Sequence, residues 1–140
     1  MIRRVGVIGL GLIGGSLLRA LAAAGLHVLG YDSNPTTRAT ARTAAARVPH
    51  AARWQVTGSI PDTAAAADLV VVAVPLPAVA GVFGALAANG YSGLVTDVTS
   101  VKGALVDLAA SHLHALGQAL SGFVGGHPMA GRETSGFAAS

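Results

Sequence analysis

Three glycines near the start of the chain stand at a spacing that suits a phosphate group. Gly9, Gly11 and Gly14 fit the pattern G-x-G-x-x-G. In this pattern the first glycine permits a tight turn, the second lets the backbone approach a pyrophosphate, and the third lets a helix pack closely on a strand. The unpaired N–H groups at the start of a helix also favour an anion. The pattern therefore predicts a dinucleotide-binding turn, to which we also assign Leu12 and Ile13.

A carboxylate follows these glycines at the distance that a dinucleotide requires. Asp32 lies 18 residues beyond Gly14, close to the separation of about 20 residues at which an acidic side chain reaches the ribose hydroxyls. Because a carboxylate repels a 2′-phosphate, Asp32 favours NAD over NADP. The sequence DSNP is also typical of a turn, with Asn34 as N-cap and Pro35 at the first helical position. Both interpretations can hold, and Arg38 is expected on a solvated helix face, although it could contact a 2′-phosphate.

Two further polar clusters are predicted to meet at one edge of a sheet. The sequence DVTSVK at residues 97–102 follows one predicted strand, and GGHPMAGRE at residues 125–133 follows the next. Ligands of parallel α/β sheets bind beyond the carboxyl ends of the strands, so both clusters would face one ligand. Of the five histidines only His127 has this position, where a neutral imidazole can act as a general base. The competing interpretation is a structural histidine that bonds to backbone in a glycine turn.

The elements that must position these residues alternate between strands and helices. The predicted strands cover residues 5–8, 28–31, 55–57, 69–74, 94–97 and 123–125, and the predicted helices cover residues 17–24, 35–47, 60–66, 78–88 and 103–116. Apolar strands that alternate with helices are typical of a parallel sheet covered on both faces. We therefore predict a doubly wound α/β fold of the Rossmann type, with three layers and the strand order 3-2-1-4-5-6. Val74 and Pro75, after the fourth strand, complete the expected cofactor-binding residues.

Composition and charge exclude several other classes of protein. Hydrophobic residues make up 52% of the 140 residues and charged residues only 11%, which excludes a disordered chain and fits one domain. Cysteine is absent, so no disulfide or thiolate metal site is expected, and a cytoplasmic location is favoured. The nine basic residues are scattered and accompanied by few aromatic residues. This pattern argues against a nucleic-acid surface.

One stretch has the length of a membrane span. Residues 69–88 are twenty consecutive residues without a charge, which is long enough to cross a bilayer. Pro75 and Pro77 divide the stretch into a β-branched part and a helix-forming part, so we predict a buried strand followed by a helix. Arg3 and Arg4, followed by fourteen uncharged residues, could begin a secretory signal, but glycines and Arg19 interrupt the apolar run, so this interpretation is disfavoured.

Three blocks of the sequence together resemble the prephenate dehydrogenase family, which includes arogenate and cyclohexadienyl dehydrogenases. The blocks are GLGLIGGSL at residues 9–17, DVTSVKG at residues 97–103 and GGHPMAGRETSG at residues 125–136. Many dehydrogenases share the first block, whereas the third is quite specific. The resemblance implies the NAD-dependent oxidative decarboxylation of prephenate to 4-hydroxyphenylpyruvate in tyrosine biosynthesis.

The resemblance also implies roles for residues of the second and third blocks. His127 corresponds to the histidine that hydrogen-bonds the ring hydroxyl, Ser100 to a serine that helps to orient it, and Glu133 to a residue of the active-site wall. Ser100 could equally cap the helix that follows it. Glu133 could instead pair with Arg132 or with solvent, and Lys102 could be a solvated residue at a helix start. Lys102 and Arg132 are the candidates for binding the carboxylates of the substrate.

Members of this family resemble two-domain chains in which a second, helical half forms the dimer and binds the substrate. We therefore expect residues 1–140 to be the nucleotide-binding domain, without the C-terminal helical domain, of a protein that forms a homodimer through that domain. Two alternatives remain open at this stage. The protein could be an arogenate dehydrogenase, or the chain could be a nucleotide-binding module without catalysis.

Overall fold

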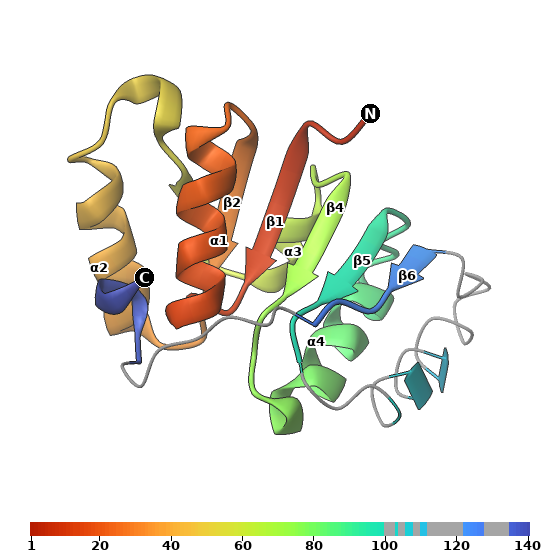
Figure 1. Cartoon of the computed structure of the whole chain (residues 1–140). Helices are drawn as coiled ribbons and strands as arrows, with labels where there is room; N and C mark the ends of the chain where they lie inside the picture. The colour runs from red at the N-terminus through yellow and green to blue at the C-terminus, as the bar shows by residue number, and fades with distance from the viewer. Residues whose placement is uncertain (100–102, 104–105, 108–109, 112–121, 128–134) are drawn as a thin grey trace.

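A six-stranded sheet forms the centre of the chain, of which the computed structural model describes residues 1–99, 103, 106–107, 110–111, 122–127 and 135–140. The strands are β1 (Arg4–Ile8), β2 (His27–Tyr31), β3 (Gln55–Val56), β4 (Leu69–Val72), β5 (Leu94–Asp97) and β6 (Phe123–Val124). All five neighbouring pairs are parallel, and the spatial order is β3-β2-β1-β4-β5-β6 (Figure 1). The predicted strand order is thereby confirmed.

Helices cover both faces of this sheet, as predicted. The α-helices are α1 (Leu12–Ala23), α2 (Pro35–Ala45), α3 (Ile60–Ala64) and α4 (Leu76–Ala88), and two 3₁₀ helices are η1 (His50–Ala52) and η3 (Phe137–Ala139). Helices α1 and α2 lie on one face, and α3 and α4 lie on the other (Figure 1). The three layers of a doubly wound fold follow from this arrangement.

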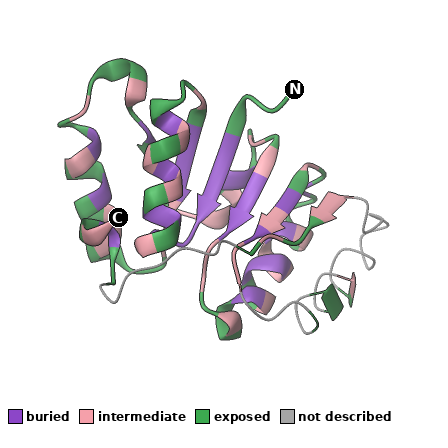
Figure 2. Cartoon of the chain, viewed as in Figure 1, coloured by how far each residue is buried: buried purple, intermediate pink, exposed green. Residues whose placement is uncertain are grey.

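Each face of the sheet has its own buried core, because successive side chains of a strand point to opposite faces. In β4 the side chains of Val70 and Val72 pack with α3 and α4, whereas that of Val71 packs with α1 and α2. Figure 2 shows the same result as buried residues that run along the central strands. Burial on both faces explains why the central strands consist almost entirely of apolar residues.

The first helix begins earlier than predicted, and the reason lies in its packing. Helix α1 begins at Leu12 rather than at Leu17, so that Gly14 and Gly15 are buried within it. The apolar helical pattern of the sequence begins only at Leu17, and the low helix propensity of glycine gives no sign of the earlier start. The predicted helix over residues 103–116 lies largely outside the described residues; the described ones, 103, 106–107 and 110–111, are helical.

The uncharged stretch of residues 69–88 is divided in the way that its prolines predicted. It forms strand β4 and helix α4, with Pro75 as the residue that precedes the helix. No helix within the described part of the chain is long and apolar enough to cross a membrane.

The last described residues return to the face of the sheet that α1 covers, an arrangement that the sequence did not predict. Phe137 in η3 is only 3% exposed, and its ring centroid lies 6.1 Å from that of Trp54. The guanidinium of Arg19 in α1 lies over both rings, and its Nε donates a hydrogen bond of 3.0 Å to Oγ of Ser140. A Cβ atom at Gly15 would lie 2.9 Å from the ring of Phe137, so a glycine in α1 provides the space for this segment.

Candidate functional site

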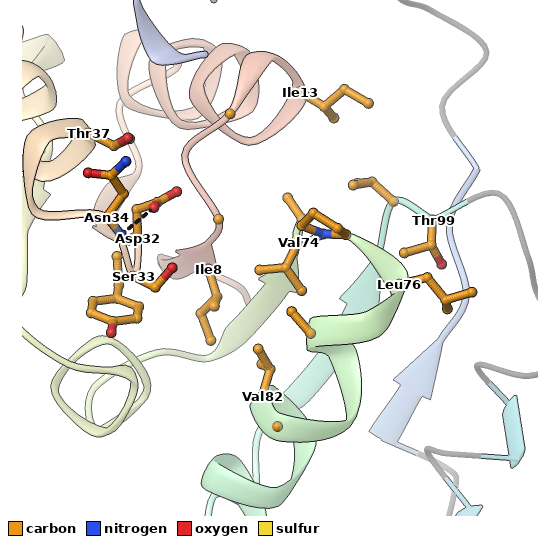
Figure 3. Close-up of a pocket in the computed structure, with 18 of the residues that line it drawn as sticks. Ile8, Ile13, Asp32, Ser33, Asn34, Thr37, Val74, Leu76, Val82 and Thr99 are labelled. Carbon is orange, nitrogen blue, oxygen red and sulfur yellow. Dashed lines mark hydrogen bonds between the residues drawn. The ribbon is translucent and has the colours of Figure 1, made fainter. Parts of the chain in front are cut away.

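A cleft of about 970 Å³ lies at the carboxyl ends of the central strands, where this fold binds its ligands. Seven of the eight residues predicted to bind a cofactor line it, namely Gly9, Gly11, Leu12, Ile13, Asp32, Val74 and Pro75. Figure 3 shows Asp32, Ser33 and Asn34 on one side of the cleft and Val74, Leu76 and Thr99 on the other. The eighth residue, Gly14, is buried beneath the glycine turn.

The geometry of the glycine turn distinguishes the roles of its three glycines. Gly9 has a φ of 96°, which side chains disfavour, and a Cβ atom there would lie 2.5 Å from the carbonyl oxygen of Ala73. A Cβ atom at Gly14 would overlap the carbonyl oxygen of Gly9. A Cβ atom at Gly11, in contrast, would meet no protein atom within 4 Å. The fold itself therefore requires Gly9 and Gly14, whereas Gly11 borders open space in the cleft.

The start of helix α1 lies in the wall of the cleft. Gly11 is the N-cap residue, no side chain caps the helix, and its first turn contains no acidic residue. The N–H groups of a first helical turn have no partners within the helix, and the helix dipole makes this end electropositive. Because Gly11, Leu12 and Ile13 all line the cleft, a phosphate group placed there would meet unpaired donors and no competing carboxylate from the helix.

Asp32 joins the glycine turn to the end of β2. Its Oδ2 accepts a hydrogen bond of 2.8 Å from the N–H of Leu10, and its Oδ1 accepts one of 2.8 Å from the N–H of Asn34. Asn34 in turn accepts a hydrogen bond from the N–H of Thr36, which confirms its predicted role as N-cap of α2. The turn interpretation of Asp32 is therefore confirmed. Since a carboxylate has about four acceptor positions, two remain for hydroxyl groups of a ligand.

The side chain of Arg38 is less exposed than we predicted for a residue on a solvated helix face. It is half-buried, and its Nη1 donates hydrogen bonds to the carbonyl oxygens of Asp32 (2.7 Å) and Ser33 (3.1 Å). Its guanidinium also lies 5.7 Å from the ring centroid of Tyr31. The prediction was wrong because the turn at residues 32–34 presents carbonyl oxygens to the second turn of α2. Arg42, one turn further on, is exposed.

On the other side of the cleft, the loops that follow β5 and β6 meet. Val98 and Thr99 line the cleft. The N–H of Gly126 donates a hydrogen bond of 3.1 Å to Oδ1 of Asp97, which brings the loop that bears His127 against the loop that bears Thr99. His127 itself is exposed and is not one of the described residues that line the cleft. The structure thus brings the described parts of the two predicted clusters, residues 97–99 and 125–127, together at one edge, and His127 does not line the cleft.

Four of the predicted site residues are not among those that the structure describes. Ser100, Lys102, Arg132 and Glu133 lie outside the described residues, so their roles remain predictions. Among the residues that the structure describes, no group of three or more His, Cys, Asp or Glu side chains could hold a metal ion.

Sequence reasoning missed several polar residues of the cleft. Ser33, Asn34, Thr37 and Thr99 contribute to its wall. Ser33 and Asn34 follow directly after Asp32, and Thr99 belongs to the block at residues 97–103. Their positions directly after strands could therefore have identified them as cleft residues. Nothing in the sequence distinguishes Thr37 from the other residues of α2.

Comparison with known proteins agrees with this geometry. The sequence profile of the family described as prephenate dehydrogenase, nucleotide-binding domain, matches residues 17–140. Over 130 residues, the chain is 35% identical to "Probable prephenate dehydrogenase NovF" of Streptomyces niveus, and this match covers 93% of the chain.

Solved structures give the same result. A Corynebacterium glutamicum protein, provisionally described as a prephenate dehydrogenase, is 36% identical with a TM-score of 0.81, and the match covers 100% of this chain and 41% of that one. Prephenate dehydrogenase from A. aeolicus, in complex with hydroxyphenyl propionate and NAD+, is 30% identical with a TM-score of 0.77, and the match covers 99% of this chain and 46% of that one.

The chain spans only part of these proteins, since the match covers 32% of the length of NovF and less than half of each solved chain. The family profile, in contrast, covers most of the chain, from residue 17 to residue 140. The chain therefore belongs to the prephenate dehydrogenase, nucleotide-binding domain, family.

Proposed function

We propose that this chain binds NAD in the cleft and that the protein to which it belongs converts prephenate to 4-hydroxyphenylpyruvate by oxidative decarboxylation. The observation that carries the proposal is a cleft lined by a glycine turn, an uncapped helix start and Asp32, in a chain of this family. The NAD+ bound in the A. aeolicus structure supports the choice of cofactor.

The residues of the cleft fit the parts of a dinucleotide. The open space beside Gly11 and the unpaired N–H groups of the first turn of α1 suit the pyrophosphate. Asp32 would accept hydrogen bonds from the ribose hydroxyls and would repel a 2′-phosphate, so NAD is favoured over NADP. When bound, NAD supplies the acceptor for the hydride that leaves the substrate.

His127 would act on the hydroxyl of the substrate. Oxidation of the ring carbon that bears this hydroxyl requires the hydroxyl to lose its proton, and a neutral imidazole within hydrogen-bond reach can accept it. The oxidised ring then loses carbon dioxide and becomes aromatic, which supplies the driving force for that step. The main task of the protein is therefore to hold the substrate carbon in position. His127 is exposed, so its imidazole is accessible to a substrate.

The two carboxylates of prephenate need cationic partners, for which we propose Lys102 and Arg132 together with residues outside this chain. We also propose that residues 1–140 are the nucleotide-binding domain of a larger protein whose further domain binds substrate and forms a homodimer. The relatives that exceed this chain in length by more than twofold support this division. We propose Ser100 and Glu133 as residues that orient the substrate.

A steady-state assay of the whole protein tests the proposal. We expect prephenate and NAD to give NADH and 4-hydroxyphenylpyruvate, with arogenate tested in parallel. His127→Asn should lower kcat by roughly 10²- to 10⁴-fold, the usual contribution of a general base, with little change in NAD affinity. The control is His50→Asn, which changes an exposed histidine in η1 and should leave kcat unchanged.

The outcomes separate the candidate functions. Turnover of arogenate in place of prephenate would assign the other substrate. NAD binding without turnover of either substrate would indicate a nucleotide-binding module. An unchanged kcat in His127→Asn would remove His127 from the mechanism.

A further inference from the structure

A buried carboxylate lies between the cleft and the loop that bears His127. Asp97, the last residue of β5, is 1% exposed. Among the described residues, only Asp97 and Thr63 are polar and buried. Burial of a carboxylate is costly unless hydrogen bonds compensate for the lost water. Asp97 is therefore expected to have a structural or functional role that an apolar residue could not fill.

The hydrogen bonds of Asp97 reach two different loops. Its Oδ2 accepts from the backbone N–H of Thr99 (2.8 Å) and from Oγ1 of Thr99 (2.5 Å), and its Oδ1 accepts from the N–H of Gly126 (3.1 Å). Thr99 lines the cleft, whereas Gly126 directly precedes His127. One side chain thus sets the position of the cleft wall relative to the backbone that carries the imidazole.

The backbone at Gly126 packs closely against the backbone of Asp97. A Cβ atom at Gly126 would overlap the carbonyl oxygen of Asp97, so only glycine allows the two loops to approach this closely. Strands β5 and β6, which lead into these two loops, are also joined through a side chain, because Oγ1 of Thr96 donates a hydrogen bond of 2.6 Å to the carbonyl oxygen of Val124. The loop after β6 is therefore held against the end of β5 at successive positions.

We propose that Asp97 is a positioning residue, which holds the loop of His127 in a fixed relation to the cleft wall at Thr99. The expected effect on turnover rests on the function proposed above, whereas the position of the loop does not. Proton transfer requires the base within about 3 Å of the substrate hydroxyl, so a small displacement of either loop lowers the rate. Asp97 acts through this geometry and makes no contact with substrate itself.

Asp97→Asn is the most direct test, because asparagine keeps the size of the side chain. Both carboxylate oxygens accept from backbone N–H groups, and an amide offers only one oxygen. Asparagine can therefore hold either Thr99 or Gly126 but not both. We expect kcat to fall by roughly ten- to a hundredfold, the factor that corresponds to one hydrogen bond to a charged group, with a smaller change in the KM of the substrate.

A double variant distinguishes positioning from a general loss of stability. If Asp97 acts through His127, Asp97→Asn should lower kcat by less than about threefold in a protein that already carries His127→Asn. Equal effects in both backgrounds would overturn the proposal. The control is Thr63→Val, which removes the other buried polar side chain, bonded to Thr57 and Ser59, and should not change kcat.

A second readout does not depend on turnover. In NMR spectra of the whole protein, Asp97→Asn should shift the imidazole signals of His127 and leave those of His27 and His50 in place. Unchanged His127 signals would refute the proposal, even if prephenate is not the substrate. A shift in a protein that turns over neither prephenate nor arogenate would refute the proposed function alone. If Asp97→Asn does not fold, Thr99→Val, which removes the hydroxyl that donates to Asp97, must shift the His127 signals, and unchanged signals in that variant would refute the proposal.

Discussion

Replacement of Phe137 by alanine tests whether the last described segment packs on α1. The ring is 3% exposed and contacts Trp54, and the guanidinium of Arg19 lies 4.5 Å from its centroid. Loss of a fully buried phenylalanine costs about 3–5 kcal/mol. The lost cation–π contact contributes about 1 kcal/mol. We therefore expect Phe137→Ala to lower the free energy of unfolding by about 4 kcal/mol.

Urea unfolding of the 140-residue chain measures this difference. Trp54 is the only tryptophan in the sequence and lies beside Phe137, so its fluorescence reports the packing directly. The control is Val124→Ala, because Val124 is 65% exposed on edge strand β6 and its truncation should change stability by less than about 0.5 kcal/mol. A loss below about 1 kcal/mol in Phe137→Ala would show that the segment does not pack against α1 in solution.

Two further predictions concern the cofactor and pH. Asp32→Ala should lower the ratio of NAD to NADP affinity at least about tenfold in a binding titration, because the carboxylate that repels a 2′-phosphate is lost; the exposed Asp62→Ala should leave the ratio unchanged. Burial, with a smaller effect of the Asp68 carboxylate, raises the pKa of Tyr91 to about 12. The unfolded pKa is about 10, so the contribution of Tyr91 to stability should be constant below pH 10 and should be lost as the pH rises from 10 to 12. Tyr91→Phe should abolish this fall, whereas Tyr31→Phe should retain it.

The strand order could be predicted because its signals are local. Short β-branched runs, the glycines of the first turn and the spacing to Asp32 each lie within a few dozen residues. The handedness of crossover connections then leaves few possible arrangements of the strands. The same reasoning located most of the cleft, since its wall consists mainly of residues that directly follow strands.

Contacts between distant parts of the chain could not be predicted in this way. Arg19 and Ser140 are 121 residues apart, and no periodic pattern links η3 to α1. The bond between Asp97 and Gly126 joins residues 29 apart in two loops that the sequence placed at one edge without relating their positions. The start of α1 was missed because the close packing at Gly14 and Gly15 outweighs the low helix propensity of glycine.

A calorimetric titration with NAD tests most directly whether the cleft binds a dinucleotide. Gly11→Val places a side chain in space that no protein atom occupies, at an extended backbone position with a φ of −73°. At the control position Gly58 a Cβ atom would also meet no protein atom within 4 Å, and Gly58 does not line the cleft. We predict that Gly11→Val keeps the unfolding midpoint of the wild type but loses NAD affinity by at least about tenfold, whereas Gly58→Val binds normally. Wild-type NAD affinity in Gly11→Val would contradict the account.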